Sequence, residues 1–292
     1  MSVAAAGTAA ASDVWTERRR RVRELRSHHG FARQLLDFYG SLLGVQEKAF
    51  DDAAASRPTA EKLCAYVAEL VVPSVIDVSV AAGPDSMRHE LIRRLEGTNP
   101  QAIVQTWIDG EDQPAVDRFL ARAALGPVLE ALGAEARAVC AGPRDALHCP
   151  HCGGPPQLSY FAPGPEDLAT GPRYLVCARC GAGWGFARMT CAACGEDRSA
   201  KLTIFSEHGT TSGEHGSVVR GLQRVVPAHD PGAVFPHLRI EACESCRGYL
   251  LSIDLAADPG AVAVVDELAA IPLDLYARER GFTKITPNLM GF

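Results

Sequence analysis

Two Cys-x-x-Cys pairs lie close together in Cys177–Gly195, which reads CARCGAGWGFARMTCAACG. Ten residues separate Cys180 from Cys191. Two thiolates on one tight turn can reach a tetrahedral metal ion from one side, so a second such turn completes a four-cysteine shell. The way this stretch is divided therefore decides how many metal sites the chain builds.

Two more pairs of the same kind flank this stretch: Cys149 and Cys152 in CPHCGG, and Cys243 and Cys246 in CESCRG. Three of the four pairs are followed by glycine, which readily adopts the left-handed backbone that brings amide groups towards the sulfurs. Arg247 takes that place in the fourth pair. Such clustering favours metal binding over disulfides or redox thiols.

The intervals between the pairs favour sequential pairing. A site made from the two central pairs would enclose only ten residues, fewer than the ~15–20 typical of zinc ribbons. Sequential pairing encloses 24 and 48 residues, enough for a hairpin or a small sheet. The first site is then Cys149, Cys152, Cys177 and Cys180, and the second is Cys191, Cys194, Cys243 and Cys246. An interleaved pairing stays open. Four thiolates suit zinc or a single iron ion, and the affinity order favours zinc.

The residues before the cysteine pairs have a helical pattern. From 13 to 141 apolar residues recur at steps of three and four, and proline and glycine divide the segment into five or six expected helices. Pro73 is expected to close one helix, and the segment 112–142 is expected to form one long helix or two helices joined near Gly126 and Pro127. A closing helix follows the last cysteine pair, with a kink expected at Pro272.

Composition narrows the class of protein. The chain has 292 residues, is 47% hydrophobic and 22% charged, and has a formal net charge of −6. The composition is typical of a soluble globular protein. The negative net charge provides no positive surface potential that would attract nucleic acid. The arginine run of the first helix is not followed by the apolar run of an export signal. The apolar run 66–83 is interrupted by Glu69, Pro73 and Asp77, so no membrane insertion is expected.

The cysteine motifs resemble the formate dehydrogenase accessory proteins known as FdhE. The resemblance is carried by CPHCGGPPQLSY, by GPRYLVCARC, by Trp184 and Arg188 ahead of CAACGE, and by EACESCRGYL. It continues in DELAAIPLDLYARERGFTKITPN, and more weakly in the N-terminal RVRELRSHHGFARQLLDFYGSLLGVQEKAF.

The resemblance implies a cytoplasmic, non-enzymatic maturation factor. Such factors bind the catalytic subunit of a respiratory formate dehydrogenase and are needed for its active assembly before export. The alternative is a rubredoxin-like electron-transfer or thiol-redox protein that acts directly on the formate dehydrogenase cofactor. The resemblance assigns the eight paired cysteines to two mononuclear iron sites, with zinc as the alternative metal. A homodimer is compatible with it.

Residues and resemblance together predict an α+β fold: an N-terminal all-α helical bundle, two rubredoxin-like or zinc-ribbon metal modules and a C-terminal helix. The expected parts are a disordered tail (1–12), a helical domain (13–143), a first module (144–190), a second module (191–256) and a C-terminal helix and tail (257–292).

The chain departs from the family pattern in three places. Gly183 stands where the family has an acidic residue before the tryptophan, and Pro287–Asn288 reverses the family's order. The segment 195–242 is longer than expected, and its four histidines are interpreted as part of an exposed loop insertion: His208, His215, His229 and His237.

The remaining candidate residues each have a plain structural interpretation. Cys64 and Cys140 are expected to be small buried hydrophobes. Trp184 and Arg188 either contact a partner, since interfaces favour both residue types, or have structural roles, in which Trp184 packs the two modules together and Arg188 pairs with a nearby acidic residue. Three acidic residues are expected on a solvated helix face rather than in acid–base chemistry: Asp266, Asp274 and Glu279.

Overall fold

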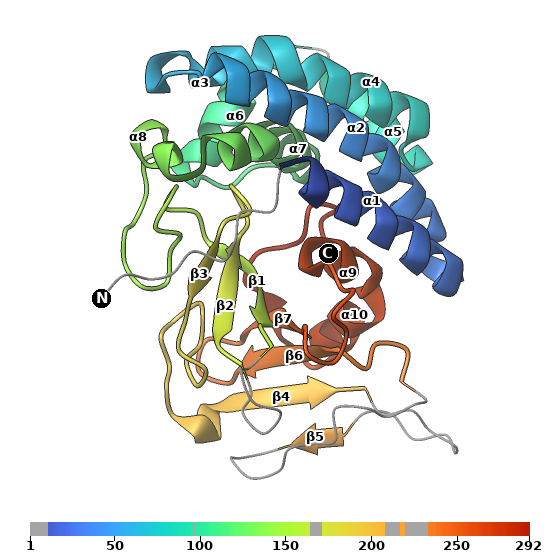
Figure 1. The fold of residues 1–292 in the computed structure, drawn as a ribbon, viewed down its shortest axis with the longest axis vertical. Helices are drawn as coiled ribbons and strands as arrows, with labels where there is room; N and C mark the ends of the chain where they lie inside the picture. The colour runs from blue at the N-terminus through green and yellow to red at the C-terminus, as the bar shows by residue number, and fades with distance from the viewer. Residues whose placement is uncertain (1–10, 96, 164–170, 208–216, 220–232) are drawn as a thin grey trace.

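The computed structural model describes residues 11–95, 97–163, 171–207, 217–219 and 233–292. Helices fill the first half and strands the second (Figure 1), so the predicted α+β class is confirmed. The N-terminal helices are α1 (Ala11–His28), α2 (Arg33–Ser56), α3 (Ala60–Tyr66), α4 (Val72–Ala82), α5 (Asp85–Leu95), α6 (Pro100–Asp109), α7 (Ala115–Leu132) and α8 (Ala136–Val139). Most of the expected N-terminal tail lies outside the described residues.

The described strands of both predicted metal modules form one sheet in the order β3-β2-β1-β7-β6-β4-β5, with β8 also paired to β7. They are β1 (Pro156–Phe161), β2 (Arg173–Cys177), β3 (Gly183–Gly185), β4 (Leu202–Ser206), β5 (Ser217–Val219), β6 (Leu238–Cys243), β7 (Gly248–Asp254) and β8 (Thr283–Lys284). Strands β1 and β7 run parallel, with Ser159 opposite Ser252, and join the two modules. The modules are therefore held in a fixed relation by backbone hydrogen bonds.

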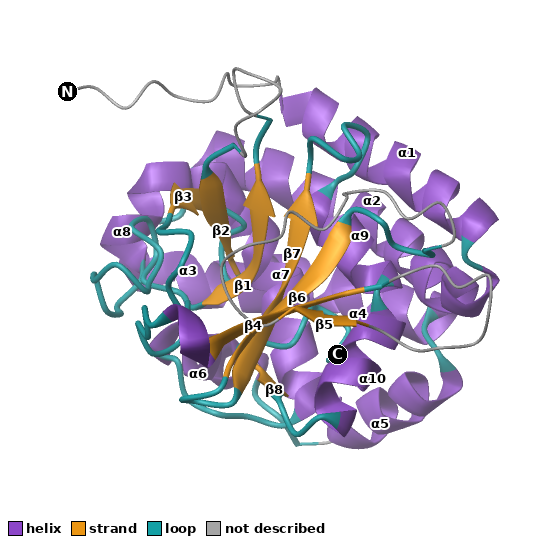
Figure 2. Ribbon diagram, turned by 90° about the horizontal axis from the view of Figure 1, so that it is seen from below, coloured by secondary structure: helices purple, strands orange, loops and turns teal. Residues whose placement is uncertain are grey.

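The C-terminal helices lie between the helical half and the sheet. Helix α9 (Ala263–Ala269) contacts α1, α2 and β1, and α10 (Ile271–Glu279) contacts β6 and β8 (Figures 1 and 2). The break at Ala270, with Pro272 in the first turn of α10, confirms the predicted kink. One continuous hydrophobic core runs through both halves and includes the first four cysteines.

Pro73 does not end its helix, contrary to the sequence prediction. A π-helical turn, Val67–Val71, joins α3 to α4, and the amide of Val72 donates to the carbonyl of Val67. This wider turn accommodates a proline that has no amide hydrogen to give. Ala60–Ala82 is therefore one continuous segment. Among the described helices it alone is long and apolar enough to cross a membrane by length and composition, and it packs on α2, α6 and α7.

Helix α7 likewise continues through Gly126 and Pro127 and ends at Gly133. Proline at 127 cannot donate to the carbonyl of Ala123, which lies four residues earlier. The side-chain amide of Gln46 donates to that carbonyl instead, over 3.2 Å. A polar residue of α2 thus replaces the missing backbone bond, and of the two predicted alternatives the helix that is unbroken at Gly126 and Pro127 is the one observed.

Candidate metal centres

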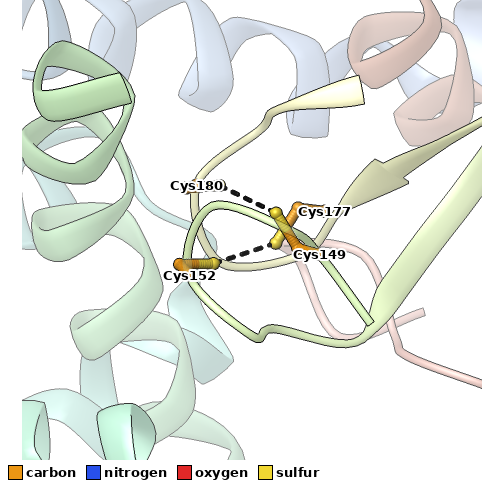
Figure 3. Close-up of side chains that lie close together, drawn as sticks. All are labelled: Cys149, Cys152, Cys177 and Cys180. Carbon is orange, nitrogen blue, oxygen red and sulfur yellow. Dashed lines mark hydrogen bonds between the residues drawn. The ribbon is translucent and has the colours of Figure 1, made fainter. Parts of the chain in front are cut away.

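The first four cysteines meet at the junction of the sheet and the helical half. Cys149 and Cys152 lie on the turn before β1, Cys177 is the last residue of β2, and Cys180 lies on the turn that follows it (Figure 3). The Sγ atoms of Cys149 and Cys180 are 3.6 Å apart, and those of Cys152 and Cys177 are 3.3 Å apart. None of the four is more than 3% exposed. The grouping is the sequential one.

The second group is Cys191, Cys194, Cys243 and Cys246, and its ligand atoms also lie within 4.8 Å of one another. Its Sγ–Sγ distances are 3.7 Å for Cys191–Cys246 and 3.8 Å for Cys194–Cys243. Cys194 and Cys246 are exposed. The second site therefore differs from the first in its access to water.

The glycines that follow the first three cysteine pairs have the expected left-handed backbone, but their amides bond to carbonyl oxygens rather than to sulfurs. Gly153, Gly181 and Gly195 all have positive φ, between 68° and 73°. The amide of each donates to the carbonyl of the cysteine four residues earlier, at 2.8, 3.1 and 3.0 Å respectively. Arg247 adopts the same backbone with φ of 58°. Its guanidinium lies 3.8 Å from the centre of the Phe282 ring and donates to the carbonyls of Arg280 and Gly281. These contacts offset the strain of a left-handed non-glycine residue.

Both groups fit a tetrahedral metal ion. A metal–sulfur bond of about 2.3 Å gives a tetrahedron with edges of about 3.8 Å, close to the sulfur distances of the two sites. The amides of Arg179, Ala193 and Gly248 point at cysteine sulfurs over 3.3, 3.4 and 3.4 Å. Burial raises the pKa of the Cys177 thiol well above its usual range. Four thiolates therefore coexist there only around a cation.

The difference in burial predicts two rates of metal release. A chelator reaches the second site through Cys194 and Cys246, whereas the first site opens only when the core opens. We expect biphasic release of metal to a colorimetric chelator, with the fast phase lost in a Cys194→Ser variant. A single phase in the wild-type chain would contradict the assignment.

The connector between the two sites holds Trp184 and Arg188. Trp184, on β3, is 9% exposed, and its indole donates to the carbonyl of Ala146 over 3.3 Å. Arg188 is exposed, lies 5.9 Å from the centre of the Phe161 ring and donates to the carbonyl of Gly171. Trp184 thus packs inside the protein, while Arg188 and the neighbouring Met189 reach the surface.

Cys64 and Cys140 are both buried in the core. Burial raises the pKa of the Cys140 thiol to about 12, and the Cys64 thiol donates to the side chain of Gln105 over 3.0 Å. Both residues therefore behave as the small hydrophobes that the sequence predicted.

The prediction of a solvated face for Asp266 and Asp274 is wrong, since both are at most 1% exposed; only Glu279 is exposed. Asp266 forms an ion pair with Arg21 of α1 and a hydrogen bond with His237, which is 2.8 Å away. His237 is therefore buried rather than part of an exposed insertion, because it has a carboxylate partner. The other three histidines of that segment lie outside the described residues.

His237, Asp258 and Asp266 lie close enough together to bind a metal ion. The Arg21 guanidinium, however, contacts both carboxylates and occupies the place that a metal cation would take.

Comparison with known proteins supports the resemblance seen in the cysteine motifs. Residues 148–188 match the model of the FdhE central domain, and residues 227–290 match that of the FdhE C-terminal domain. Over these two segments the chain is similar to the FdhE family. The matched segments contain six of the paired cysteines: Cys149, Cys152, Cys177, Cys180, Cys243 and Cys246.

Two similar curated proteins are both described as FdhE homologues. The one from Pseudomonas aeruginosa is 32% identical over 142 residues, which is 49% of this chain and 38% of that protein. The one from Aquifex aeolicus is 32% identical over 147 residues, which is 50% of this chain and 42% of that protein. The alignments thus span about two fifths of the length of these relatives. The chain also superposes on the crystal structure of the FdhE protein from P. aeruginosa, with a TM-score of 0.61 and 22% sequence identity. The superposition covers 95% of each of the two chains, so the fold is shared.

Proposed function

We propose that this FdhE chain is a non-enzymatic accessory protein that binds the catalytic subunit of a formate dehydrogenase and supports its assembly in the cytoplasm before export. The observation that supports the proposal most strongly is the pair of four-thiol sites fixed to one sheet in a chain with FdhE central and C-terminal domains. Within the described residues the other buried charged groups are engaged in ion pairs or hydrogen bonds that hold elements together. The site chemistry that is left is metal binding by thiolates.

The surface that we propose to bind the catalytic subunit lies beside the second cysteine site. A groove of about 50 Å³ is lined by the connector, by β4 and by β6, and it includes Arg188, Met189 and Ile204. Met189 and Ile204 are large apolar side chains, 36% and 37% exposed. Apolar side chains beside an arginine are typical of the centre of a protein interface. Trp184 is buried on β3 and is not among the residues that line this groove.

Glutamate in place of both Met189 and Ile204 tests the docking face. We expect binding of the formate dehydrogenase catalytic subunit to weaken about tenfold or more, as measured by titration calorimetry, with the metal content unchanged. Leu70→Glu is the matched control, because Leu70 is 63% exposed on the helical half. Equal effects of the two variants, or no binding by the wild-type chain, would contradict the proposal.

A redox role is the second candidate, favoured by the exposure of Cys194 and Cys246. We propose iron in both sites, with zinc as the alternative. Iron permits electron transfer from the exposed site, whereas zinc has no redox chemistry. Metal analysis and a visible spectrum of protein isolated without oxygen distinguish them, and a colourless zinc protein excludes electron transfer.

A further inference from the structure

Two arginines are buried beside the first metal site. Arg179, inside the second cysteine pair, is 4% exposed, and Arg122 of α7 is 6% exposed. Together with Cys177 and Cys180 they line one cavity of about 100 Å³ between the helical half and the sheet. Their guanidinium groups lie 5.9 and 5.5 Å from the centre of the Trp107 ring. Both arginines thus line the same cavity as two cysteines of the first site.

The hydrogen bonds of Arg179 go to neutral groups. Its Nη1 donates to the carbonyl of Cys152 over 3.0 Å, and its Nη2 donates to the carbonyl of Trp107, at the end of α6, over 3.1 Å. Its Nε–H has no partner among the described residues. No described carboxylate forms an ion pair with Arg179. A buried cation without a counter-charge is strongly destabilising.

Arg122 differs from Arg179 in having an indirect carboxylate. It donates to Gln157, which in turn donates to Glu267. Glu267 is itself paired with Lys284 over 2.8 Å. Near the second site, by contrast, arginines are paired directly: Arg173 with Glu241 and Arg198 with Glu196, each over 2.6 Å. Arg179 is therefore the buried cation whose counter-charge is missing.

The loaded first site supplies that charge. Four thiolates around a divalent ion carry a net charge of −2, and burial leaves this charge without water to stabilise it. We propose that Arg179 is the counter-charge of the loaded first site and that, through the carbonyl of Trp107, it couples metal loading to the seating of the helical half. This inference rests on the proposed metal-binding role of the cysteines.

The coupling has a structural basis in the position of Arg179. Its backbone amide lies 3.3 Å from Cys177 Sγ, while its side chain reaches α6 of the helical half. When the thiolates form around a cation, the guanidinium is stabilised in the place where it contacts α6. When the site is empty, the same buried charge opposes that contact, so α6 is held less firmly.

Arg179→Met and Arg179→Lys test the inference, in a background where Cys194→Ser and Cys246→Ser disable the second site. For Arg179→Met we expect the zinc affinity of the first site, measured by chelator competition, to fall about 10- to 100-fold. Arg179→Lys, which keeps the charge, should retain most of the affinity. Arg198→Met is the control, because Arg198 is exposed and paired with Glu196.

Thermal unfolding separates this role from a merely structural one. Arg179→Met should lower the Tm of the zinc-loaded protein but leave the Tm of the metal-free protein unchanged or raised, so that the shift caused by zinc shrinks. Hydrogen exchange in α6 should slow on loading in the wild-type chain and not in Arg179→Met. Equal losses of Tm with and without zinc would overturn the inference. If the wild-type first site bound no zinc, the proposed metal-binding function itself would fail, which is a different result.

Discussion

Replacing Gly154 with alanine is expected to abolish metal binding at the first site and leave the second site loaded. A Cβ atom at this position would lie 2.8 Å from Cys177 Sγ, 2.9 Å from Arg179 Cβ and 3.2 Å from Cys152 Sγ. The first two distances are shorter than carbon and sulfur atoms tolerate. The neighbours are fixed, since two of them are sulfurs of the site. The cysteine turns must therefore separate, and the four sulfurs can no longer surround one ion.

Metal analysis and unfolding experiments measure this effect. Overpacking alone costs about 1–3 kcal/mol, and the variant also loses the folding free energy supplied by metal binding, which is of order 10 kcal/mol for a structural zinc site. We expect the metal content to fall by half and the Tm to fall sharply. Gly185→Ala is the matched control, because no atom lies within 4 Å of its Cβ position. Full metal content in the Gly154→Ala protein would contradict the assigned geometry.

Some features of the first metal site can be predicted from the sequence, whereas the need for glycine at position 154 cannot. The spacing of the cysteine pairs favours the sequential grouping, because an interval of ten residues is short for a ribbon, and the structure has that grouping. The glycines with positive φ are also predictable, because each directly follows a pair. The need for glycine at position 154 could not be predicted. Its φ is ordinary, and its closest contacts come from Cys177 and Arg179, which lie 23 and 25 residues later in the chain.

The joining of the two modules into one sheet is a second feature that spacing does not predict. Strands β1 and β7 are parallel and far apart in the chain, so no hairpin turn marks their pairing. The contact of Arg179 with Trp107 is not predictable either, because the two residues are 72 positions apart in the chain. Local patterns predict the two sites, whereas the geometry between them depends on long-range pairing.

The burial of Asp274 and Glu267 could not be predicted because their partner lies in the C-terminal segment. Lys284 of β8 is 2.8 Å from a Glu267 oxygen and 3.0 Å from an Asp274 oxygen. In sequence, an acidic residue on a helix indicates a solvated face, because acidic side chains are seldom buried without a partner. Only the pairing of β8 with β7 brings Lys284 beneath α9 and α10.

Replacing Lys284 with methionine is therefore expected to be strongly destabilising. The variant leaves two carboxylates in the core, Glu267 and Asp274, each essentially inaccessible to water. The hydroxyl of Tyr249 donates to Asp274 over 2.8 Å but carries no charge. Removing one partner of a buried ionic group costs about 3–5 kcal/mol. Lys62→Met, an exposed position on α3, is the control and should change the free energy of unfolding by less than about 0.5 kcal/mol.

The destabilisation should depend on pH in a definite direction. Burial already raises the pKa of Glu267 with Lys284 present, and removing the lysine raises it further. A carboxyl whose folded pKa exceeds its unfolded pKa favours folding below the unfolded value, and this contribution is lost as pH rises through the folded value. The deficit of Lys284→Met relative to wild type should therefore be smaller at about pH 5 than at about pH 8.

Adding Glu267→Gln to Lys284→Met identifies the cause, because the amide removes one buried charge at nearly constant volume. We expect urea unfolding at neutral pH to show partial recovery of the free energy of unfolding, and a weaker pH dependence than in the single variant. A Lys284→Met protein as stable as Lys62→Met, or a deficit that is the same at both pH values, would show that the three charges do not form the buried network described here. Recovery in the double variant assigns the loss to unpaired charge rather than to lost packing of the lysine stem.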